Sequence, residues 1–216
     1  MLELAVKSLV AYLAGSLMGA LLLGALRGVD IRTLGSGNAG GTNALRTQGI
    51  WFALGVVIID VAKGWFAAGL LPGLALPGIA TDPQLGRSWL TVACATAATL
   101  GHVYPVWHQF RGGKGAATLI GVLLGVAPRF LAPVLGVWLA VVVLTGYVGL
   151  GTMLATLSLP VLLVLRGARD PALFAFATAM AAFVAYTHRA NITRMRLGTE
   201  SRARRLWLLG LRSAPP

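Results

Sequence analysis

Long apolar runs constrain the fold of this chain more than any other feature. A helix needs roughly 20 apolar residues to cross the hydrocarbon core of a bilayer. The sequence predicts such spans near residues 4–26, 51–71, 88–108, 130–148, 150–165 and 171–187. Only 11% of the residues are charged, whereas soluble domains normally carry about 25%. We therefore predict an all-α integral membrane protein.

A further apolar run follows Gly115 and is shorter than the others. It extends over the twelve residues from Ala116 to Ala127, and a helix of that length is roughly 18 Å long. The helix either extends from the glycine-rich stretch before it through Pro128, or is tilted or partly re-entrant. We predict a seven-transmembrane-helix bundle, with six spans and a re-entrant segment as the alternative. The first run, 4–26, is too long for a signal-peptide core, and we expect it to be retained.

Basic residues orient the predicted bundle. With seven spans and an internal C-terminus, the inner segments hold 12 of the 18 Lys and Arg residues and the outer segments hold 5. Because Lys and Arg favour the cytoplasmic side, three polar stretches at 30–49, 101–118 and 187–202 are expected to face the cytoplasm. The net charge of +12 follows from basic residues at the ends of apolar runs, so we expect no nucleic-acid partner.

The chain is predicted to have two parts. Residues 1–187 form a transmembrane helical domain that carries two cytoplasmic motif loops. Residues 188–216 form a cytoplasmic C-terminal motif followed by a basic amphipathic tail. The composition of the tail is typical of a segment that lies on anionic membrane lipid. The residues that indicate this are Arg202, Arg204, Arg205, Trp207, Leu208 and Leu211.

The stretch at 101–118, GHVYPVWHQFRGGKGAAT, has the composition of a phosphate-binding loop. Gly112, Gly113 and Gly115 allow the backbone to turn its N–H groups toward a ligand, and Lys114 adds a positive charge. A helix that begins near Gly115 would add its positive N-terminal end. The alternative is an ordinary turn beside basic membrane anchors. The spacing is not that of a Walker loop.

The stretch at 30–49, DIRTLGSGNAGGTNALRTQG, is rich in hydroxyl and amide groups. Ser36, Asn38, Thr42 and Asn43 offer hydrogen bonds, and Arg46 can bind a phosphate through two parallel hydrogen bonds. The alternative is a solvated connection in which Thr42 and Asn43 cap the next helix. A simple connection seldom needs twenty residues so rich in glycine, so we favour a functional loop.

Two further groups of polar residues lie in or beside the spans. In the third stretch, His188, Asn191 and Arg194 recur at helical spacing and can share one helical face, although a histidine at a membrane border can also be merely interfacial.

In the second span, Asp60 and Lys63 are three residues apart. Intramembrane charges mark function or mutual neutralisation, and we expect this pair to brace the bundle.

The acidic residues exclude several kinds of chemistry. The sequence contains six Asp and Glu residues, and no two of them form a metal-ligand cluster of the kind that a magnesium-dependent phosphotransferase needs. We therefore expect no metal ion and no cofactor. No histidine is followed five positions later by Asp, so the HxxxxD arrangement of common acyl-CoA-dependent acyltransferases is missing.

Three segments, at 36–46, 101–118 and 188–200, resemble in order and spacing the signature motifs of the bacterial acyl-phosphate:glycerol-3-phosphate acyltransferases, the PlsY type. The resemblance covers essentially the whole chain. It implies transfer of a fatty acyl group from acyl phosphate to the 1-hydroxyl of glycerol 3-phosphate, the first step of bacterial phospholipid synthesis. It also implies an active site on the cytoplasmic face of the inner membrane, and an acyl-phosphate-forming enzyme as supplier of the donor.

The resemblance assigns roles to individual residues. Lys114 and the amides of 112–115 would bind a phosphoryl group, that of the acyl donor. Ser36, Arg46, His188 and Asn191 resemble the family's contacts to glycerol 3-phosphate. The expected catalytic residues are His188, Lys114 and Asn191. The residues expected to bind substrate are Ser36, Gly37, Asn38, Thr42, Asn43, Arg46, His102, Gly112, Gly113, Lys114, Gly115, His188 and Asn191.

The sequence leaves alternatives for the chemical step, for the base and for the function itself. No cysteine or Ser–His–Asp set suggests an acyl-enzyme, so direct attack by the glycerol hydroxyl is simpler. The base is His188, His102 or a phosphate of the substrate. Gly149 and Gly151 stand where the family usually has serines, and Thr152 is a possible substitute. The competing function is that of a small membrane transporter of anionic phosphorylated metabolites, which would release no phosphate from the donor.

Overall fold

The computed structural model describes residues 1–204 and 206–208, and within them every regular element is a helix. The all-helical prediction is therefore confirmed for this part of the chain. Contacts divide the chain into two compact units, Met1–Pro128 and Arg129–Pro216, which we call unit 1 and unit 2. The predicted division after residue 187 uses a different criterion, because it separates the membrane part of the chain from the cytoplasmic part. That division stays a prediction.

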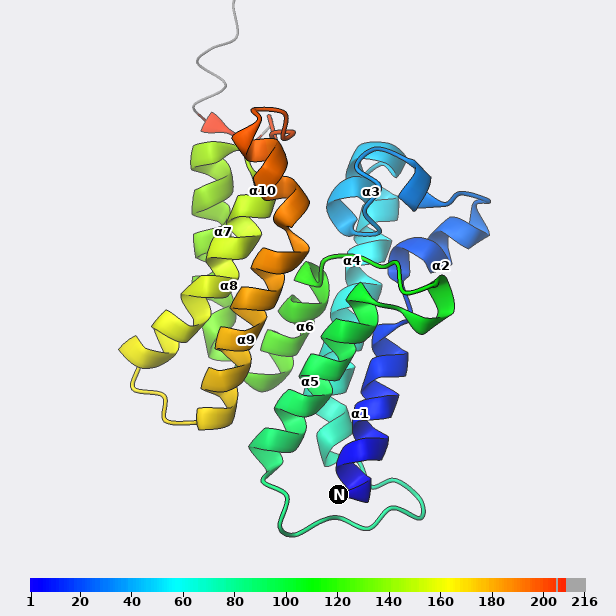
Figure 1. Ribbon diagram of the computed structural model, residues 1–216, viewed down its shortest axis with the longest axis vertical. Helices are drawn as coiled ribbons and strands as arrows, with labels where there is room; N and C mark the ends of the chain where they lie inside the picture. Colours follow the sequence, from blue (N-terminus) through cyan, green and yellow to red (C-terminus); the bar gives the residue numbers. More distant parts are fainter. Residues whose placement is uncertain (205, 209–216) are drawn as a thin grey trace, which may run out of the picture. The chain divides into compact units, whose positions relative to one another are not determined.

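Unit 1 is built from helices that pack in pairs. Its longer helices are α1 (Leu2–Gly15), α2 (Gly19–Leu26), α3 (Gly41–Gln48), α4 (Ile50–Trp65), α5 (Arg87–Val103) and α6 (Ala116–Val126). Its shorter helical segments are η1 (Ile31–Thr33), η2 (Phe66–Leu70), η3 (Leu71–Gly73) and η4 (Val106–His108). α1 packs along α5, α4 packs along α6, and both α2 and α3 contact α4 (Figure 1).

Small residues allow these helices to approach closely. A Cβ atom at Gly15 would collide with the backbone of Ala98 on α5, and one at Gly121 would collide with the Val61 carbonyl on α4. Lipid tails are as apolar as leucine, so helices in a membrane associate largely through such close packing. Gly28, by contrast, has open space around it.

The first apolar run is not one straight helix. α1 and α2 are bent by 45° at a break between Gly15 and Gly19. Buried side chains of α4 bind the backbone groups that the break releases. Lys63 Nζ donates to the Leu17 carbonyl at 2.9 Å, and the Gly19 amide donates to Asp60 Oδ1 at 3.3 Å. The expected single span at 4–26 is therefore a bent pair, because these distant partners make the break favourable.

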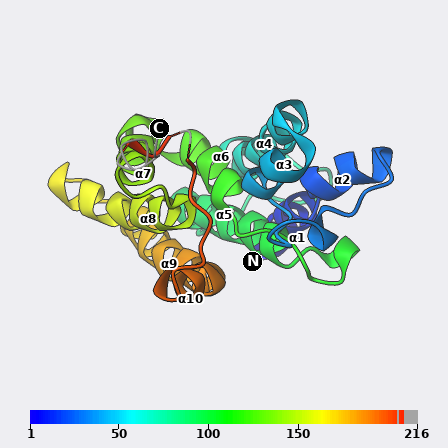
Figure 2. The same cartoon turned by 90° about the horizontal axis from the view of Figure 1, so that it is seen from above.

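Unit 2 is a layer of three long helices with a bent extension. Its elements are η5 (Pro128–Phe130), which crosses the boundary between the units, α7 (Leu131–Thr145), α8 (Val148–Leu165), α9 (Pro171–Thr187) and α10 (Arg189–Arg196). α8 packs between α7 and α9, and α10 contacts α8 and α9 after a bend of 54° (Figure 2). Asp170 starts α9 because its carboxylate accepts from the amides of Ala172 and Leu173.

The described residues contain three helical stretches that are long and apolar enough to cross a membrane. They are Ile50–Gly73, Pro128–Thr145 and Val148–Leu165, and the two bent pairs, α1 with α2 and α9 with α10, raise the number to as many as five. α6 ends at Val126, so the predicted extension of this helix through Pro128 is wrong. The count of seven spans stays a prediction.

Candidate active site

One buried amide shapes the first polar stretch. Asn43, on α3, is only 1% exposed. Its Oδ1 accepts from the Ser36 amide at 2.9 Å, and its Nδ2 donates to the carbonyls of Ile31 and Leu34 at 3.2 and 3.0 Å. Asn43 therefore ties 31–36 to α3, and in this structure its polar atoms serve the loop. Its predicted contact with substrate stays a prediction.

The sequence did not predict α3 within this stretch. The helix begins at Gly41 with Gly40 as its N-cap, so the alternative in which Thr42 and Asn43 cap the following helix is wrong. The short helix fixes Arg46 one turn beyond Thr42, and both side chains are exposed, as is Ser36. The exposed surface of this stretch therefore carries two hydroxyl groups, of Ser36 and Thr42, and the guanidinium of Arg46. The remaining predicted contacts here, Gly37 and Asn38, lie in the preceding turn.

Arg32 joins the first polar stretch to the second. Its guanidinium pairs with both carboxylate oxygens of Asp30, at 2.7 to 3.2 Å, and also donates to the carbonyls of His108 and Arg111 at 3.2 and 3.4 Å. The guanidinium holds the pKa of Asp30 below its usual value. Sequence reasoning treated Arg32 only as a basic topology signal, although an acidic residue two positions earlier was a hint of local pairing.

Residues 112–115, which we call the glycine loop, lie directly against the end of α5. The amides of Gly112 and Gly113 donate to the carbonyls of Val103 and His102, both at 3.1 Å. A Cβ atom at Gly113 would collide with His102 Nε2 and would lie 3.2 Å from the Ala39 carbonyl. Unit 1 therefore brings the first and second stretches into contact. The predicted binding of a phosphoryl group by the Gly112 and Gly113 amides must account for these existing hydrogen bonds.

A helix begins immediately after the glycine loop, as predicted. Gly115, with φ +90°, is the N-cap of α6, and the Leu119 amide makes the first helical bond to its carbonyl at 2.9 Å. The N–H groups of 116–118 therefore have no acceptor within the helix. They carry the partial positive charge of the helix end beside Lys114, which is half-buried. Anion-binding character in this loop is concentrated at the start of α6.

Three buried polar residues of α4 and α5 lie beneath the glycine loop. Lys63 Nζ is 2.9 Å from Asp60 Oδ1, and His102 Nδ1 is 3.6 Å from the same oxygen. Asp60, Lys63 and His102 are 0%, 7% and 2% exposed. We call these three residues the buried polar cluster. The pair of Asp60 and Lys63 braces the break between α1 and α2, in agreement with the structural role expected from the sequence.

The third polar stretch belongs to unit 2. His188 lies at the junction of α9 and α10 and is 4% exposed. Its Nδ1 lies 2.8 Å from the Val184 carbonyl. A carbonyl oxygen can only accept a hydrogen bond, so Nδ1 carries the proton and Nε2 carries the lone pair of the neutral ring.

Asn191 and Arg194 share one face of α10, as their spacing predicts. Glu200 joins them because its two carboxylate oxygens accept from Asn191 Nδ2 and Arg194 Nε, each at 2.6 Å. On α8, a Cβ atom at Gly149 would lie 3.0 Å from Asn191 Nδ2. Glycine at 149 thus gives Asn191 space. The sequence analysis counted Glu200 only among the six acidic residues that form no metal-ligand cluster, and it missed this role.

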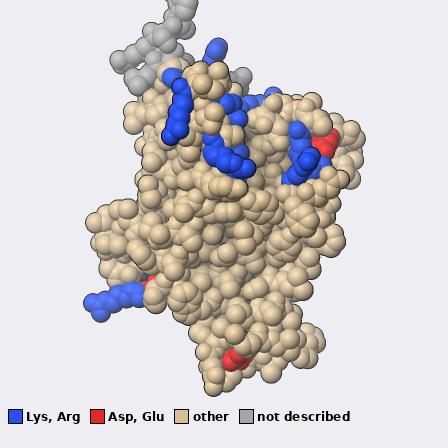
Figure 3. Space-filling model, in the orientation of Figure 1, with Lys and Arg blue, Asp and Glu red and all other residues tan. Residues whose placement is uncertain are grey.

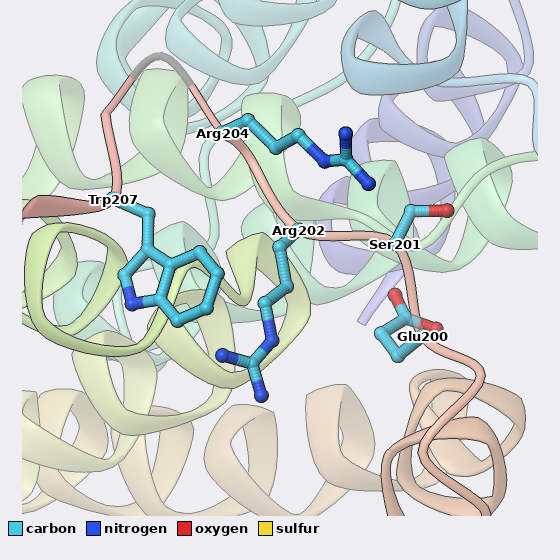
Figure 4. Close-up of a pocket in the computed structure, with 5 residues that line it drawn as sticks. All are labelled: Glu200, Ser201, Arg202, Arg204 and Trp207. Carbon is cyan, nitrogen blue, oxygen red and sulfur yellow. The ribbon is translucent and has the colours of Figure 1, made fainter. Parts of the chain in front are cut away.

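The described part of the tail packs against unit 2. Arg202 stacks on the rings of Tyr147 and Trp207, at 4.6 and 4.1 Å, and donates to the Tyr147 hydroxyl at 3.0 Å. A cavity of about 430 Å³ lies beside it, lined by Glu200, Ser201, Arg202, Arg204 and Trp207 (Figure 4). Basic side chains gather over this end of unit 2 (Figure 3). The predicted Arg205 and Leu211 lie outside the described residues, and lipid contact stays a prediction.

The structure thus assembles the predicted site residues in two groups. Unit 1 joins the first and second stretches, and unit 2 holds the third. The meeting of all three in one pocket stays a prediction. Among residues 1–204 and 206–208, no three His, Cys, Asp or Glu side chains gather as metal ligands would.

Comparisons with known proteins agree with one another. A family model described as "Glycerol-3-phosphate acyltransferase" matches residues 5–198. Curated relatives of the same name include one from Chlorobaculum parvum, 38% identical over 89% of this chain and 93% of its own length. Another, from Geobacter sulfurreducens, is 39% identical over 94% of this chain and 98% of its own length.

Two solved structures have a similar fold. Both are crystal structures of PlsY (YgiH), an integral membrane glycerol 3-phosphate acyltransferase. The glycerol 3-phosphate form is 33% identical with a TM-score of 0.80, and the lysophosphatidic acid form is 32% identical with a TM-score of 0.78. Each alignment covers 92% of this chain and 94% of the solved chain.

Proposed function

Because this chain belongs to the glycerol-3-phosphate acyltransferase family, we propose that it transfers a fatty acyl group from acyl phosphate to the 1-hydroxyl of glycerol 3-phosphate. The observation that carries the proposal is its likeness, over nearly the whole chain, to a protein solved with the acceptor and with lysophosphatidic acid. Acyl phosphate as donor is the more specific part of the proposal. It is supported by the missing HxxxxD arrangement and by the three motifs.

The reaction is a direct displacement at the acyl carbonyl carbon. The 1-hydroxyl oxygen of glycerol 3-phosphate forms the new ester bond, and the bond from the carbonyl carbon to the phosphate oxygen breaks. Inorganic phosphate leaves with the electron pair, and the hydroxyl proton passes to a base. Acyl phosphate is a mixed anhydride and is already activated, so the protein mainly positions the two substrates and stabilises charge.

The two anions would be bound by different groups. Lys114 and the first turn of α6 bind the phosphoryl group of the donor, since a positive side chain there adjoins a helix N-terminus. Exposed Ser36 and Arg46 of unit 1 bind the phosphate of the acceptor. The resemblance of the third motif adds His188 and Asn191 as further contacts to glycerol 3-phosphate. The Gly112 and Gly113 amides are already bonded to α5, so these glycines act by allowing the loop to lie close to it.

Two groups can accept the hydroxyl proton. One is His188 Nε2, which carries the lone pair, and the other is a phosphate oxygen of the substrate, with a second pKa of about 6 as in phosphate monoesters. A His188→Ala variant separates them. Loss of a general base lowers turnover by about 10²–10⁴-fold, whereas a residue that only helps to bind the acceptor mainly raises KM. Near-native turnover at saturating glycerol 3-phosphate would exclude His188 as the base.

The cellular setting is part of the proposal. We place the protein in the inner membrane as a seven-span bundle, with its C-terminus and active site on the cytoplasmic side. The support for this orientation is the excess of basic residues in the inner segments. An enzyme that makes acyl phosphate would supply the donor, because a mixed anhydride must be formed by a separate activation step.

The test is a phosphate-release assay with purified protein in detergent. Acyl phosphate and glycerol 3-phosphate should yield phosphate and lysophosphatidic acid in equal amounts, and acyl-CoA should not replace the donor. Chelation of divalent cations should leave the rate unchanged, because the described residues offer no three-ligand site. Lys114→Ala should abolish most of the activity. A transporter would release no phosphate in detergent, and that result would overturn the proposed function.

A further inference from the structure

The buried polar cluster is larger than a brace requires. Lys63 and Asp60 together bind both sides of the break in the first apolar run. The ammonium lies at the C-terminal end of α1, where it binds the Leu17 carbonyl, and the carboxylate lies at the N-terminal end of α2, where it binds the Gly19 amide. Each charge matches the partial charge of the helix end that it faces. This arrangement alone needs no histidine.

His102 extends the cluster to the glycine loop. The two nitrogen atoms of its ring face different neighbours. Nδ1 lies 3.6 Å from Asp60 Oδ1, which is within ion-pair range but long for a hydrogen bond. The Nε2 edge packs against Gly113, and the His102 carbonyl accepts from the Gly113 amide at 3.1 Å. The ring therefore connects the carboxylate of α4 to the residue that precedes Lys114.

The break in the first run also holds the turn that leads into the glycine loop. Ser16 Oγ accepts from the Val106 amide at 3.4 Å, and the Tyr12 hydroxyl donates to the Tyr104 carbonyl at 2.8 Å. The glycine loop is thus fixed at its start by the break and beneath Gly113 by His102. The break and His102 both contact the pair of buried charges on α4.

We propose that Asp60, Lys63 and His102 are positioning residues that hold the glycine loop, and with it Lys114, in place for phosphoryl binding. This inference rests on the proposed function. His102 is buried between Asp60 and Gly113 and acts through the loop. This assignment differs from the base or substrate contact that the sequence suggested for it. A displacement of about 1 Å at a reacting group can lower a rate by about 100-fold, so the support is expected to affect turnover.

A second buried ion pair in unit 1 provides a matched control. Lys7 Nζ donates to Glu3 Oε1 at 2.9 Å and to the Pro72 carbonyl at 2.8 Å. Lys63 Nζ makes the same two kinds of contact, to a carboxylate and to a backbone carbonyl, at 2.9 Å each. Glu3 and Lys7 are 2% and 3% exposed. The two lysines therefore have matched contacts. Glu3 is also bound by Arg87 at 2.8 and 2.9 Å, so loss of Lys7 should cost less stability than loss of Lys63, and only the Lys63 pair contacts His102.

The experiment compares Lys63→Met with Lys7→Met in the full chain, measured by phosphate release and by thermal unfolding in detergent. Both variants should unfold at lower temperature than the wild type. Lys63→Met should lower kcat/KM for acyl phosphate by about 10–100-fold, and Lys7→Met by less than about twofold. Equal loss of activity in the two variants would overturn the proposal. An inactive wild type would instead refute the proposed function, and this inference with it.

A second pair of variants keeps the proposal testable if Lys63→Met does not fold. His102→Gln keeps a polar atom near the position of Nε2, and His102→Asn keeps one near Nδ1. A positioning role predicts that His102→Gln retains activity within about tenfold of the wild type, with an unchanged pH profile. A base would lose about 10²–10⁴-fold in both variants, and that result would overturn the assignment.

Discussion

The first polar stretch, in unit 1, is held by a neutral amide, whereas the third, in unit 2, is held by a carboxylate. Asn43 is buried and binds one backbone amide and two backbone carbonyls. Glu200 binds two side chains of α10, one of them charged and partly exposed. An amide can both donate and accept, so it suits a turn of backbone. A carboxylate only accepts, so it suits the donors of Asn191 and Arg194.

The difference indicates what each anchor controls. Loss of Asn43 leaves backbone groups buried without partners, so it should damage the loop itself. Loss of the Glu200 charge leaves α10 intact, because the hydrogen bonds of the helix do not depend on it, and should release only the side chains of Asn191 and Arg194. Four changes test this comparison.

Asn43→Ala should have the largest effect. Three backbone groups lose their partners, and one of them, the Ile31 carbonyl, is buried, where an unsatisfied group costs about 1–3 kcal/mol. We expect the free energy of unfolding to fall by about 1–3 kcal/mol, and kcat/KM to fall about 100-fold because Ser36 and Arg46 lose their placement. Thermal unfolding and phosphate release measure the two effects. Gln48→Ala, on the same helix, is the control, and an Asn43 variant that behaves like it would show that the loop holds its own shape.

Glu200→Gln should have a smaller and more selective effect. The amide has nearly the shape of the carboxylate but lacks its charge, and hydrogen bonds to charged groups contribute about 1.5–3 kcal/mol. We expect KM for glycerol 3-phosphate to rise about tenfold, with a small change in the unfolding temperature. Thr199→Ala removes a neighbouring exposed hydroxyl and serves as control. Unchanged KM would mean that Asn191 does not depend on Glu200 for its orientation.

Gly149→Ala tests the space beside Asn191. The added Cβ would lie 3.0 Å from Asn191 Nδ2, so the amide must move by a few tenths of an ångström. We expect kcat/KM for glycerol 3-phosphate to fall about threefold to tenfold, by the sensitivity of rates to such displacements. Gly136→Ala, on α7, is the control because nothing lies within 4 Å of its Cβ position. Equal kinetics for the two variants would count against a tight fit at Asn191.

The link between Asp30 and Arg32 should give the smallest effect, visible only in acid. The pKa of Asp30 is lower in the folded state. Its contribution to stability is therefore complete above the unfolded pKa of about 3.9 and is lost as the pH falls from there toward the folded value. The pair is partly exposed, so the contribution is at most about 1 kcal/mol. Unfolding temperatures of the wild type and Asp30→Asn should converge as the pH falls below the unfolded pKa, and a constant gap would contradict this account.

Local signals in the sequence were sufficient to predict many features of this protein. The apolar runs predicted most of the long helices, and the glycine-rich loop that ends at Gly115 predicted where α6 begins. The repeat of Asn191 and Arg194 predicted their common face. The three motifs identified the glycerol-3-phosphate acyltransferase family. Each of these depends on residues within a few turns of one another, where periodicity and backbone preferences are sufficient.

Contacts between distant segments decided the rest. The break at 16–18 depends on Lys63, and the contact between the first two stretches depends on Arg32 reaching the carbonyls of His108 and Arg111. The burial of His102 depends on Asp60 of another helix. Hydrophobicity and spacing do not encode which buried polar group satisfies which partner, because that choice is made only when helices pack and remove water. Tertiary structure therefore determined how the predicted groups are held.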